Sequence, residues 1–203
     1  MGRLYAGIIR RTCADPDFPA QREADGKVNI LIGGWSLGGL LSLEVAKVLT
    51  GDSGVRVIGV LMVDSLCPVN PPSVRLEAFD HLGMGKSRNE FLTLKAMKEA
   101  LRTIQEWVPP VWAGDQLAQR PRFSLLRALD PIPTGTDRIH VADIYRNNPT
   151  LGWDQYDKDM FTDVGSVSGN HFEMFSFKHI PEVSEAMKGY LDRLEMLYHA
   201  SEA

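Results

Sequence analysis

The sequence lacks most of the features that mark secreted, metal-binding or membrane proteins. Its 203 residues include 2 cysteines, Cys13 and Cys67, and no CxxC pair, which disfavours a disulfide framework and a zinc site. No apolar run approaches the roughly 18 residues that a membrane span needs. The N-terminus also lacks the apolar stretch of a secretion signal. These absences favour a cytoplasmic protein, in a reducing compartment, that does not enter a membrane.

An excess of basic charge is absent as well. Lys and Arg total 22 against 26 Asp and Glu, so the net charge is −4 and a nucleic-acid partner is not indicated. Hydrophobic residues make up 44% of the chain, which is enough for a packed core and disfavours a disordered protein. The length predicts one domain, which we place at residues 1–203.

Short apolar runs alternate with helical patterns along this domain. Strands separated by helices predict an α/β fold with a parallel sheet. The final helix is marked by an apolar stripe with a period of 3.6 and by Pro181 in its first turn. The predicted strands are 28–32, 55–63, 123–128 and 164–167, and the predicted helices are 4–10, 37–49, 137–146 and the stretch after Pro181.

Residues 68–121 interrupt this alternation. They contain proline pairs at 71–72 and 109–110 and no convincing strand. Between the pairs, apolar residues recur at spacings of three and four, which predicts an amphipathic helix. An insert of this length between two strands favours a helical lid within the domain, and the alternative is an ordinary surface helix. The periodic residues are Phe91, Leu94, Met97, Leu101 and Ile104.

The segment Gly34-Trp35-Ser36-Leu37-Gly38 carries a G-x-S-x-G pattern. The pattern alone is weak, but it lies between a predicted buried strand and a helix, where a nucleophile elbow is required. Ser36 would occupy a sharp, strained turn, and Gly34 and Gly38, without Cβ atoms, would let the strand and the helix approach closely. The Leu37 N–H would then lie at a helix N-terminus, where it could donate to an oxyanion. The alternative, which this context disfavours, is a glycine-rich turn with an inert serine.

A serine hydroxyl is a poor nucleophile without a base. His171 follows the last predicted strand, so it should share a sheet edge with Ser36. It also follows the serine in chain order, as this architecture requires. We therefore expect His171 to be the general base. The other histidines are not at predicted strand ends: His81, His140, His179 and His199.

Two carboxylates are candidates for orienting His171. Asp64 ends the strand after the elbow, and Asp130 follows the next strand. Both strand ends face the same edge of a parallel sheet, so either could hold the imidazole and stabilise its protonated form. Topology alone slightly favours Asp130, since many such hydrolases take the acid from that later strand.

Four segments resemble the landmarks of one family, the thioesterase domains of polyketide synthases and nonribosomal peptide synthetases. Residues 33–39 (GGWSLGG) look like their elbow, and residues 63–68 (VDSLCP) resemble the (I/V)-D-S-x-C-P segment of the fungal members. Residues 151–154 (LGWD) and 169–174 (GNHFEM) resemble their C-terminal landmarks. The resemblance covers about residues 28–192.

This resemblance implies an α/β-hydrolase-type sheet and a catalytic triad of Ser36, Asp64 and His171. In that family the acid comes from the strand directly after the elbow, which selects Asp64 and demotes Asp130. The implied substrate is an acyl, polyketide-like chain on the phosphopantetheine arm of an acyl carrier protein. No cofactor and no metal are expected.

The chain departs from the family at its N-terminus. Complete members have further strands before the elbow strand, and a loop after one of them supplies a second oxyanion N–H. Only 27 residues precede Val28 here, and they predict one short helix and a polar loop. We therefore expect the sheet to lack the family's N-terminal strands, and activity to suffer from it.

The sequence thus predicts a serine thioesterase that releases its acyl chain by hydrolysis or cyclisation through an acyl-enzyme. A carboxylesterase acting on oxygen esters is the alternative within the same class. A catalytically weak homologue that binds a carrier or a synthase is the alternative from another class.

Overall fold

The computed structural model of the chain describes residues 1–69, 87–135 and 137–202. Part of the expected insert, residues 70–86 with the proline pair at 71–72 and His81, lies outside the described residues. Among the described helices, none is long and apolar enough to cross a bilayer.

The described strands form one parallel sheet whose neighbours follow chain order, β1-β2-β3-β4. The predicted α/β fold with a parallel sheet is therefore confirmed. β1 and β4 are longer than the sequence predicted, and β2 has the predicted bounds. The strands are β1 (Val28–Trp35), β2 (Val55–Val63), β3 (Arg122–Ala128) and β4 (Phe161–Val167).

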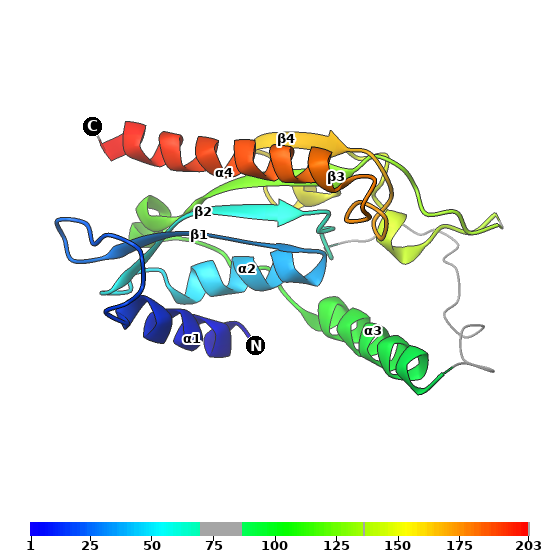
Figure 1. Cartoon of the computed structure of the whole chain (residues 1–203), viewed down its shortest axis with the longest axis horizontal. Coiled ribbons are helices and arrows are strands. Elements are labelled where there is room, and N and C mark those ends of the chain that lie inside the picture. The colour runs from blue at the N-terminus through cyan, green and yellow to red at the C-terminus, as the bar shows by residue number, and fades with distance from the viewer. Residues whose placement is uncertain (70–86, 136, 203) are drawn as a thin grey trace.

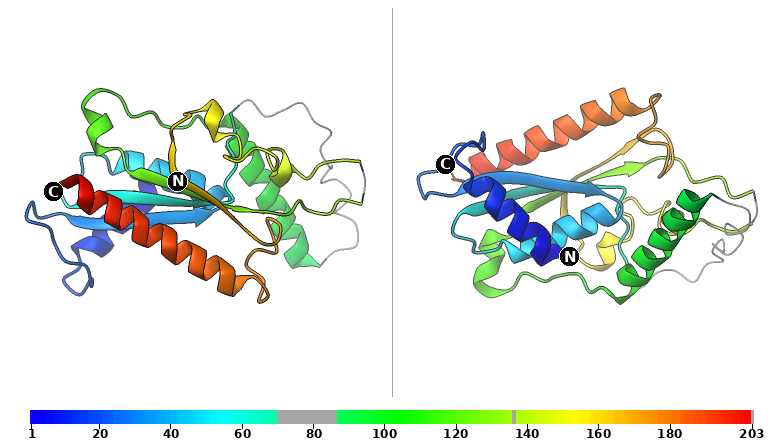
Figure 2. Two further views of the ribbon diagram at one scale, coloured as in Figure 1. Left: turned by 90° about the horizontal axis from the view of Figure 1, so that it is seen from above. Right: turned by 60° about the horizontal axis from the view of Figure 1, so that its bottom comes forward.

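Helices cover both faces of this sheet. α4 (Ile180–Glu202) lies along one face, and α2 (Leu37–Val48) lies on the other with α1 (Gly2–Ala14) outside it (Figures 1 and 2). Because all four strands run in the same direction, their carboxyl ends meet at one edge. In open α/β sheets this edge is where ligands bind.

β2 shows why a continuous apolar run belongs in the middle of the sheet. Val60 and Met62 belong to the core under α2, whereas Leu61 and Val63 belong to the core under α4. Successive side chains of a strand point to opposite faces, so both faces of β2 must be apolar.

β1 was expected to be buried on both faces, and this expectation is wrong for most of the strand. In the described part of the sheet its one strand neighbour is β2. Val28 is buried, but residues 30–32 are only half-buried because β1 is the outermost strand of the described sheet. Before β1, residues 1–27 contribute α1 and a single antiparallel bridge between Arg22 and Val28.

The helix predicted at 137–146 is also wrong. This stretch holds one 3-10 turn, η3 (Val141–Asp143), followed by further turns. His140 precedes this turn in extended conformation and is not helical. Asp143 and Arg146 are both buried and hydrogen-bonded beneath the sheet edge, so tertiary polar contacts decide the local conformation.

The amphipathic helix of the insert is present as α3 (Arg88–Glu106). It projects beyond the carboxyl edge of the sheet, with its C-terminal end toward α2 (Figure 1). That end is anchored by the Trp107 indole N–H, which donates to Glu44 Oε1 on α2 at 2.6 Å. Near the other end Phe91 is 58% exposed.

Candidate active site

Ser36 occupies the turn between β1 and α2, as the sequence predicted. Its backbone has φ 55° and ψ −120°, a strained conformation for a residue other than glycine. The turn is fastened by the Ser36 N–H, which donates to the carbonyl of Val63 at the end of β2 (2.8 Å). The sharp, strained elbow is therefore confirmed, and it places Ser36 at the N-terminus of α2.

Two glycines make this turn possible, but only one of them, Gly34, was expected. A Cβ on Gly34 would lie 2.4 Å from the carbonyl carbon of Gly38, so backbone fills that space. A Cβ on Gly38 would meet nothing within 4 Å, whereas one on Gly39 would lie 2.1 Å from Ser65 Oγ. The expected steric need at Gly38 is thus wrong, and the close approach on the helix side occurs at Gly39.

Asp64 and His171 come together at the carboxyl edge from the ends of β2 and β4. The Asp64 Oδ2 atom is 2.7 Å from His171 Nδ1, and both side chains are buried. The His171 ring also lies against Trp35, with 4.8 Å between ring centroids and a tilt of 31°. The sequence paired these two residues only through the family resemblance.

The Asp64 carboxylate has four close donors. Besides His171, it accepts hydrogen bonds from the Ala128 N–H (2.9 Å) and from two nitrogens of Arg146 (2.6 and 2.8 Å). Burial alone would raise the pKa of Asp64, but the hydrogen bonds from Arg146 and His171 outweigh it and lower the pKa to about 2. An ionised carboxylate only accepts, so His171 Nδ1 carries a proton, and in the neutral imidazole Nε2 then has the lone pair.

Asp130, the competing acid, serves the fold. Its Oδ2 accepts the Gly169 N–H at 3.0 Å, and its own N–H donates to the Gly169 carbonyl at 3.0 Å. These bonds fasten the loop after β3 to the loop that carries His171. The exposed Asp130 carboxylate therefore binds a backbone N–H group and not the His171 imidazole.

Ser36 and His171 line one cavity of about 570 Å³. Its walls come from the elbow, from residues 66–68 after β2, from α3 and from the segment around η3. Leu37, the predicted oxyanion donor, lies at the start of α2 and belongs to the same lining. Most of the lining is apolar: Leu37, Leu40, Leu66, Met97, Leu101, Ile104, Val141, Ile144 and Phe172.

Of the remaining histidines that the structure describes, His140 also lines this cavity and packs edge-on against Phe172, with 5.4 Å between centroids. His179 is buried beside Gly169, and His199 is exposed on α4. The structure therefore brings His171 to Asp64 and leaves the others outside that pair.

Arg146 and Asp143 are the site residues that sequence reasoning missed. Both are buried behind Asp64, and Arg146 Nε donates to Asp143 Oδ1 at 2.9 Å. They lie in the stretch predicted as a helix, where a charged pair three residues apart reads as an ordinary surface contact. No signal in the single sequence distinguishes them from such a pair.

The landmark at residues 151–154 supports the end of β2. The fully buried Trp153 donates its indole N–H to the Ser65 carbonyl at 2.7 Å, and the Leu151 carbonyl accepts the Cys67 N–H at 3.0 Å. This packing fixes the chain on both sides of Leu66, next to the Asp64 turn.

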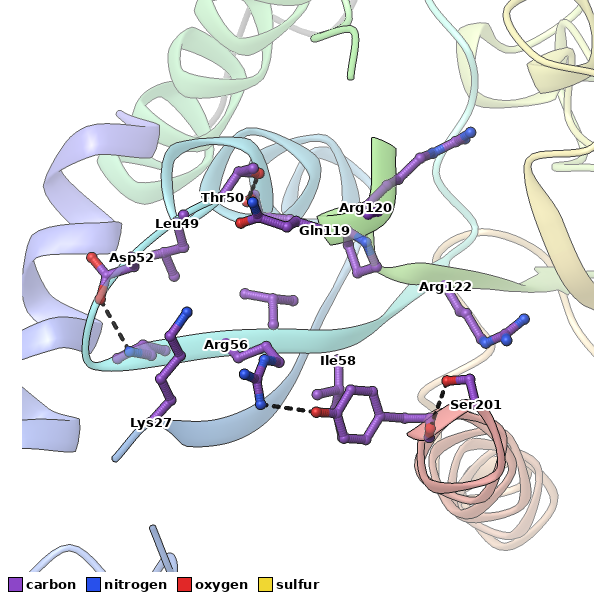
Figure 3. Close-up of a pocket in the computed structure, with 17 residues that line it drawn as sticks. Lys27, Leu49, Thr50, Asp52, Arg56, Ile58, Gln119, Arg120, Arg122 and Ser201 are labelled. Atoms are coloured by element: carbon purple, nitrogen blue, oxygen red, sulfur yellow. Dashed lines mark hydrogen bonds between the residues drawn. The ribbon is translucent and has the colours of Figure 1, made fainter. Parts of the chain in front are cut away.

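A second cavity, of about 530 Å³, opens at the amino-terminal ends of the strands (Figure 3). Two of its basic side chains have local partners. Arg56 donates to the Tyr198 hydroxyl (2.9 Å), and Arg120 donates to Asp157 (2.6 Å). In the described part of the chain, no group of three or more His, Cys, Asp or Glu side chains could hold a metal.

A parallel sheet with a serine elbow at its carboxyl edge, facing a buried histidine and carboxylate, is an α/β-hydrolase-type structure. Solved structures agree with this class: the NocB thioesterase domain from the nocardicin cluster matches with a TM-score of 0.61 and 25% identity, over 95% of this chain and 72% of that domain. No protein-family model matches the sequence.

Curated relatives define the family. The thioesterase frbD of Dothideomycetidae sp. (strain 11243) is 30% identical over 187 residues, 87% of this chain and 69% of the relative. The nonribosomal peptide synthetase imqB of Aspergillus flavus is 26% identical over 229 residues, 96% of this chain and 6% of the synthetase. The chain belongs to the thioesterase family of fungal polyketide and nonribosomal peptide biosynthesis.

Proposed function

We propose that this protein is a serine thioesterase in which Ser36 is the nucleophile, His171 the general base and Asp64 the residue that orients His171. The observation that carries the proposal is the shared cavity. A serine on a strained elbow faces the same space as a histidine whose Nδ1 is 2.7 Å from a buried, ionised carboxylate.

The reaction follows from this arrangement. Ser36 Oγ attacks the thioester carbonyl while its proton passes to His171 Nε2. The negative charge that develops on the carbonyl oxygen is stabilised by the Leu37 N–H at the start of α2. The C–S bond then breaks, the thiol leaves with the proton from His171, and an acyl-Ser36 ester remains. Water or a hydroxyl of the acyl chain attacks this ester and regenerates Ser36.

The character of the cavity supports an acyl substrate. Leu40, Leu66, Leu101 and Ile104 offer apolar surface to a chain attached at Ser36. We propose that this chain arrives on the phosphopantetheine arm of an acyl carrier protein, as the resemblance to the thioesterase domains of polyketide synthases and nonribosomal peptide synthetases implies. The apolar side of α3 would then act as the lid wall of the insert and limit the access of water.

The test is formation of the acyl-enzyme. The purified chain is mixed with an acyl-N-acetylcysteamine thioester and, in parallel, with the same acyl group as an oxygen ester. Intact-protein mass spectrometry then follows the adduct, and peptide mapping locates it. We expect a transient adduct on Ser36, faster turnover of the thioester, and neither in the Ser36→Ala variant.

Other outcomes separate the alternatives. Faster turnover of the oxygen ester would identify a carboxylesterase. No adduct and no turnover, together with retained binding of a loaded carrier, would identify a binding homologue. An adduct on a residue other than Ser36 would overturn the nucleophile.

A further inference from the structure

Behind the Asp64–His171 pair lies a buried hydrogen-bond network formed by Arg146 and Asp143. All five N–H groups of the Arg146 guanidinium have an acceptor. Nη1 donates to Asp64 Oδ1 (2.6 Å) and to the Ala128 carbonyl (2.8 Å). Nη2 donates to Asp64 Oδ2 (2.8 Å) and to the Ala142 carbonyl (3.1 Å), and Nε donates to Asp143 Oδ1 (2.9 Å).

Asp143 is the last residue of this network. Its second oxygen accepts the Ile132 N–H at 2.6 Å, so it too is fixed by backbone. Asp143 and Arg146 are 6% and 5% exposed, and Asp64 is 0% exposed. The low dielectric of such a site strengthens each charge interaction and makes an unpaired charge costly.

The formal charges in this network nearly cancel. With neutral His171, Asp64, Arg146 and Asp143 sum to −1, and protonation of His171 brings the set to zero. If Arg146 faced Asp64 alone, it would cancel the carboxylate, and a protonated His171 would leave a net positive charge in the protein interior. Asp143 restores the negative charge that the imidazolium needs.

We propose that Arg146 and Asp143 are positioning residues for the thioesterase reaction, Arg146 fixing the plane of the Asp64 carboxylate and Asp143 offsetting the charge that Arg146 brings. This inference rests on the proposed function, because it gives the pair a role through His171. Arg146 forms a bidentate fork with Asp64, which directs Oδ2 at His171 Nδ1.

Other titratable groups surround the pair and are left unchanged in the test. The half-buried Arg127 on β3 is a further cation in contact with Arg146, since its guanidinium donates to the Arg146 carbonyl at 2.6 Å. The remaining groups come from the loops and the cavity lining: Cys67, Asp130, His140, Glu173 and His179.

The experiment measures the titration of His171 directly, by NMR of ¹³C-labelled histidine side chains assigned with a His171→Gln variant. Arg146→Met leaves the set more negative, so the midpoint of the His171 titration should rise by about one pH unit. Asp143→Asn leaves it more positive, so the midpoint should fall by about one pH unit. The double variant restores the charge of −1 and should return close to the wild-type midpoint.

The Arg120–Asp157 ion pair (2.6 Å) provides the matched control, because it lies at the opposite end of β3. Arg120→Met and Asp157→Asn make the same charge changes there and should leave the His171 midpoint unchanged. Arg146→Lys keeps the charge without the fork, so it should keep the midpoint and lower kcat by about tenfold or more.

Shifts of the same sign in both single variants, or no shift, would overturn the proposal. If circular dichroism shows that Arg146→Met does not fold, the other two variants still test the proposal. Asp143→Asn should lower the midpoint of the His171 titration, and Arg146→Lys should leave it unchanged. If the wild-type protein has no turnover, the proposed thioesterase function fails, while the NMR titrations still decide whether the charge balance acts on His171.

Discussion

The two edges of the sheet hold cavities of nearly equal volume, about 570 and 530 Å³, with opposite character. At the carboxyl edge the walls are apolar and the polar groups lie buried behind them. At the amino-terminal edge the walls carry more polar groups (Figure 3), and two of its partly exposed basic side chains have neighbouring partners: Arg56 contacts Tyr198, and Arg120 contacts Asp157.

The difference shows that cavity size does not indicate chemistry. A partly exposed ion pair contributes little free energy and leaves nothing poised to react. A buried carboxylate whose pKa is about 2 holds its charge against desolvation, next to an imidazole and a strained serine. The following predictions test whether function lies only at the carboxyl edge, in order of decreasing effect.

The largest effect is expected at the elbow. Ser36→Ala should lower kcat for a thioester substrate by about 1,000-fold or more, because only binding and oxyanion effects remain. The fold should persist, since the Ser36 contacts in the turn are made by its backbone. Steady-state kinetics and circular dichroism check both parts, and comparable turnover by the variant would remove Ser36 from the mechanism.

The two carboxylates after β2 and β3 should differ sharply. Asp64→Asn should lower kcat by about 100- to 10,000-fold, because an amide does not stabilise the protonated imidazole as a carboxylate does. Asp130→Asn should stay within about threefold, since an amide oxygen still accepts the Gly169 N–H. Parallel kinetics on both variants decide this, and the reverse order would reinstate Asp130 as the acid.

Acid should lower the free energy of unfolding by protonating Asp64. The folded-state pKa of about 2 lies below the unfolded value near 4, so Asp64 stabilises the fold above pH 4. This contribution is lost as the pH falls through 2, and it amounts to about 2 kcal/mol between pH 5 and pH 2. Urea unfolding at several pH values should show the stability gap between wild type and Asp64→Asn narrowing by that amount, and a constant gap would contradict the low pKa.

The smallest effect is expected at the amino-terminal cavity. Arg56→Gln removes the contacts to Tyr198 and Asp25, but the side chain is 30% exposed, so stability should fall by no more than about 1 kcal/mol. Turnover should be unchanged. A large loss of kcat with intact folding would show that this edge also serves the reaction.

Several features of the fold and the site were predictable from local sequence. The apolar run of β2 requires burial on both faces, and the glycines around Ser36 require a tight turn, so strand, elbow and helix follow from local patterns. Strand order then places the ends of β1, β2 and β4 at one edge, which is why His171 was found. The choice of Asp64 over Asp130 needed the family resemblance, because both follow strands of the same sheet.

What the sequence determined by itself was therefore the α/β pattern, the strained serine turn and the histidine after the last strand, since each depends on neighbours close in the chain. Local pattern left the carboxylate that meets His171 open, and the tertiary structure shows that it is Asp64. Only the tertiary structure decided that Gly39 rather than Gly38 must lack a Cβ, and that residues 137–146 do not form the expected helix. It also decided the burial of Asp143 and Arg146. Their hydrogen bonds to a carboxylate about 80 residues away outweigh local helix propensity, and no periodicity in the sequence encodes such a contact.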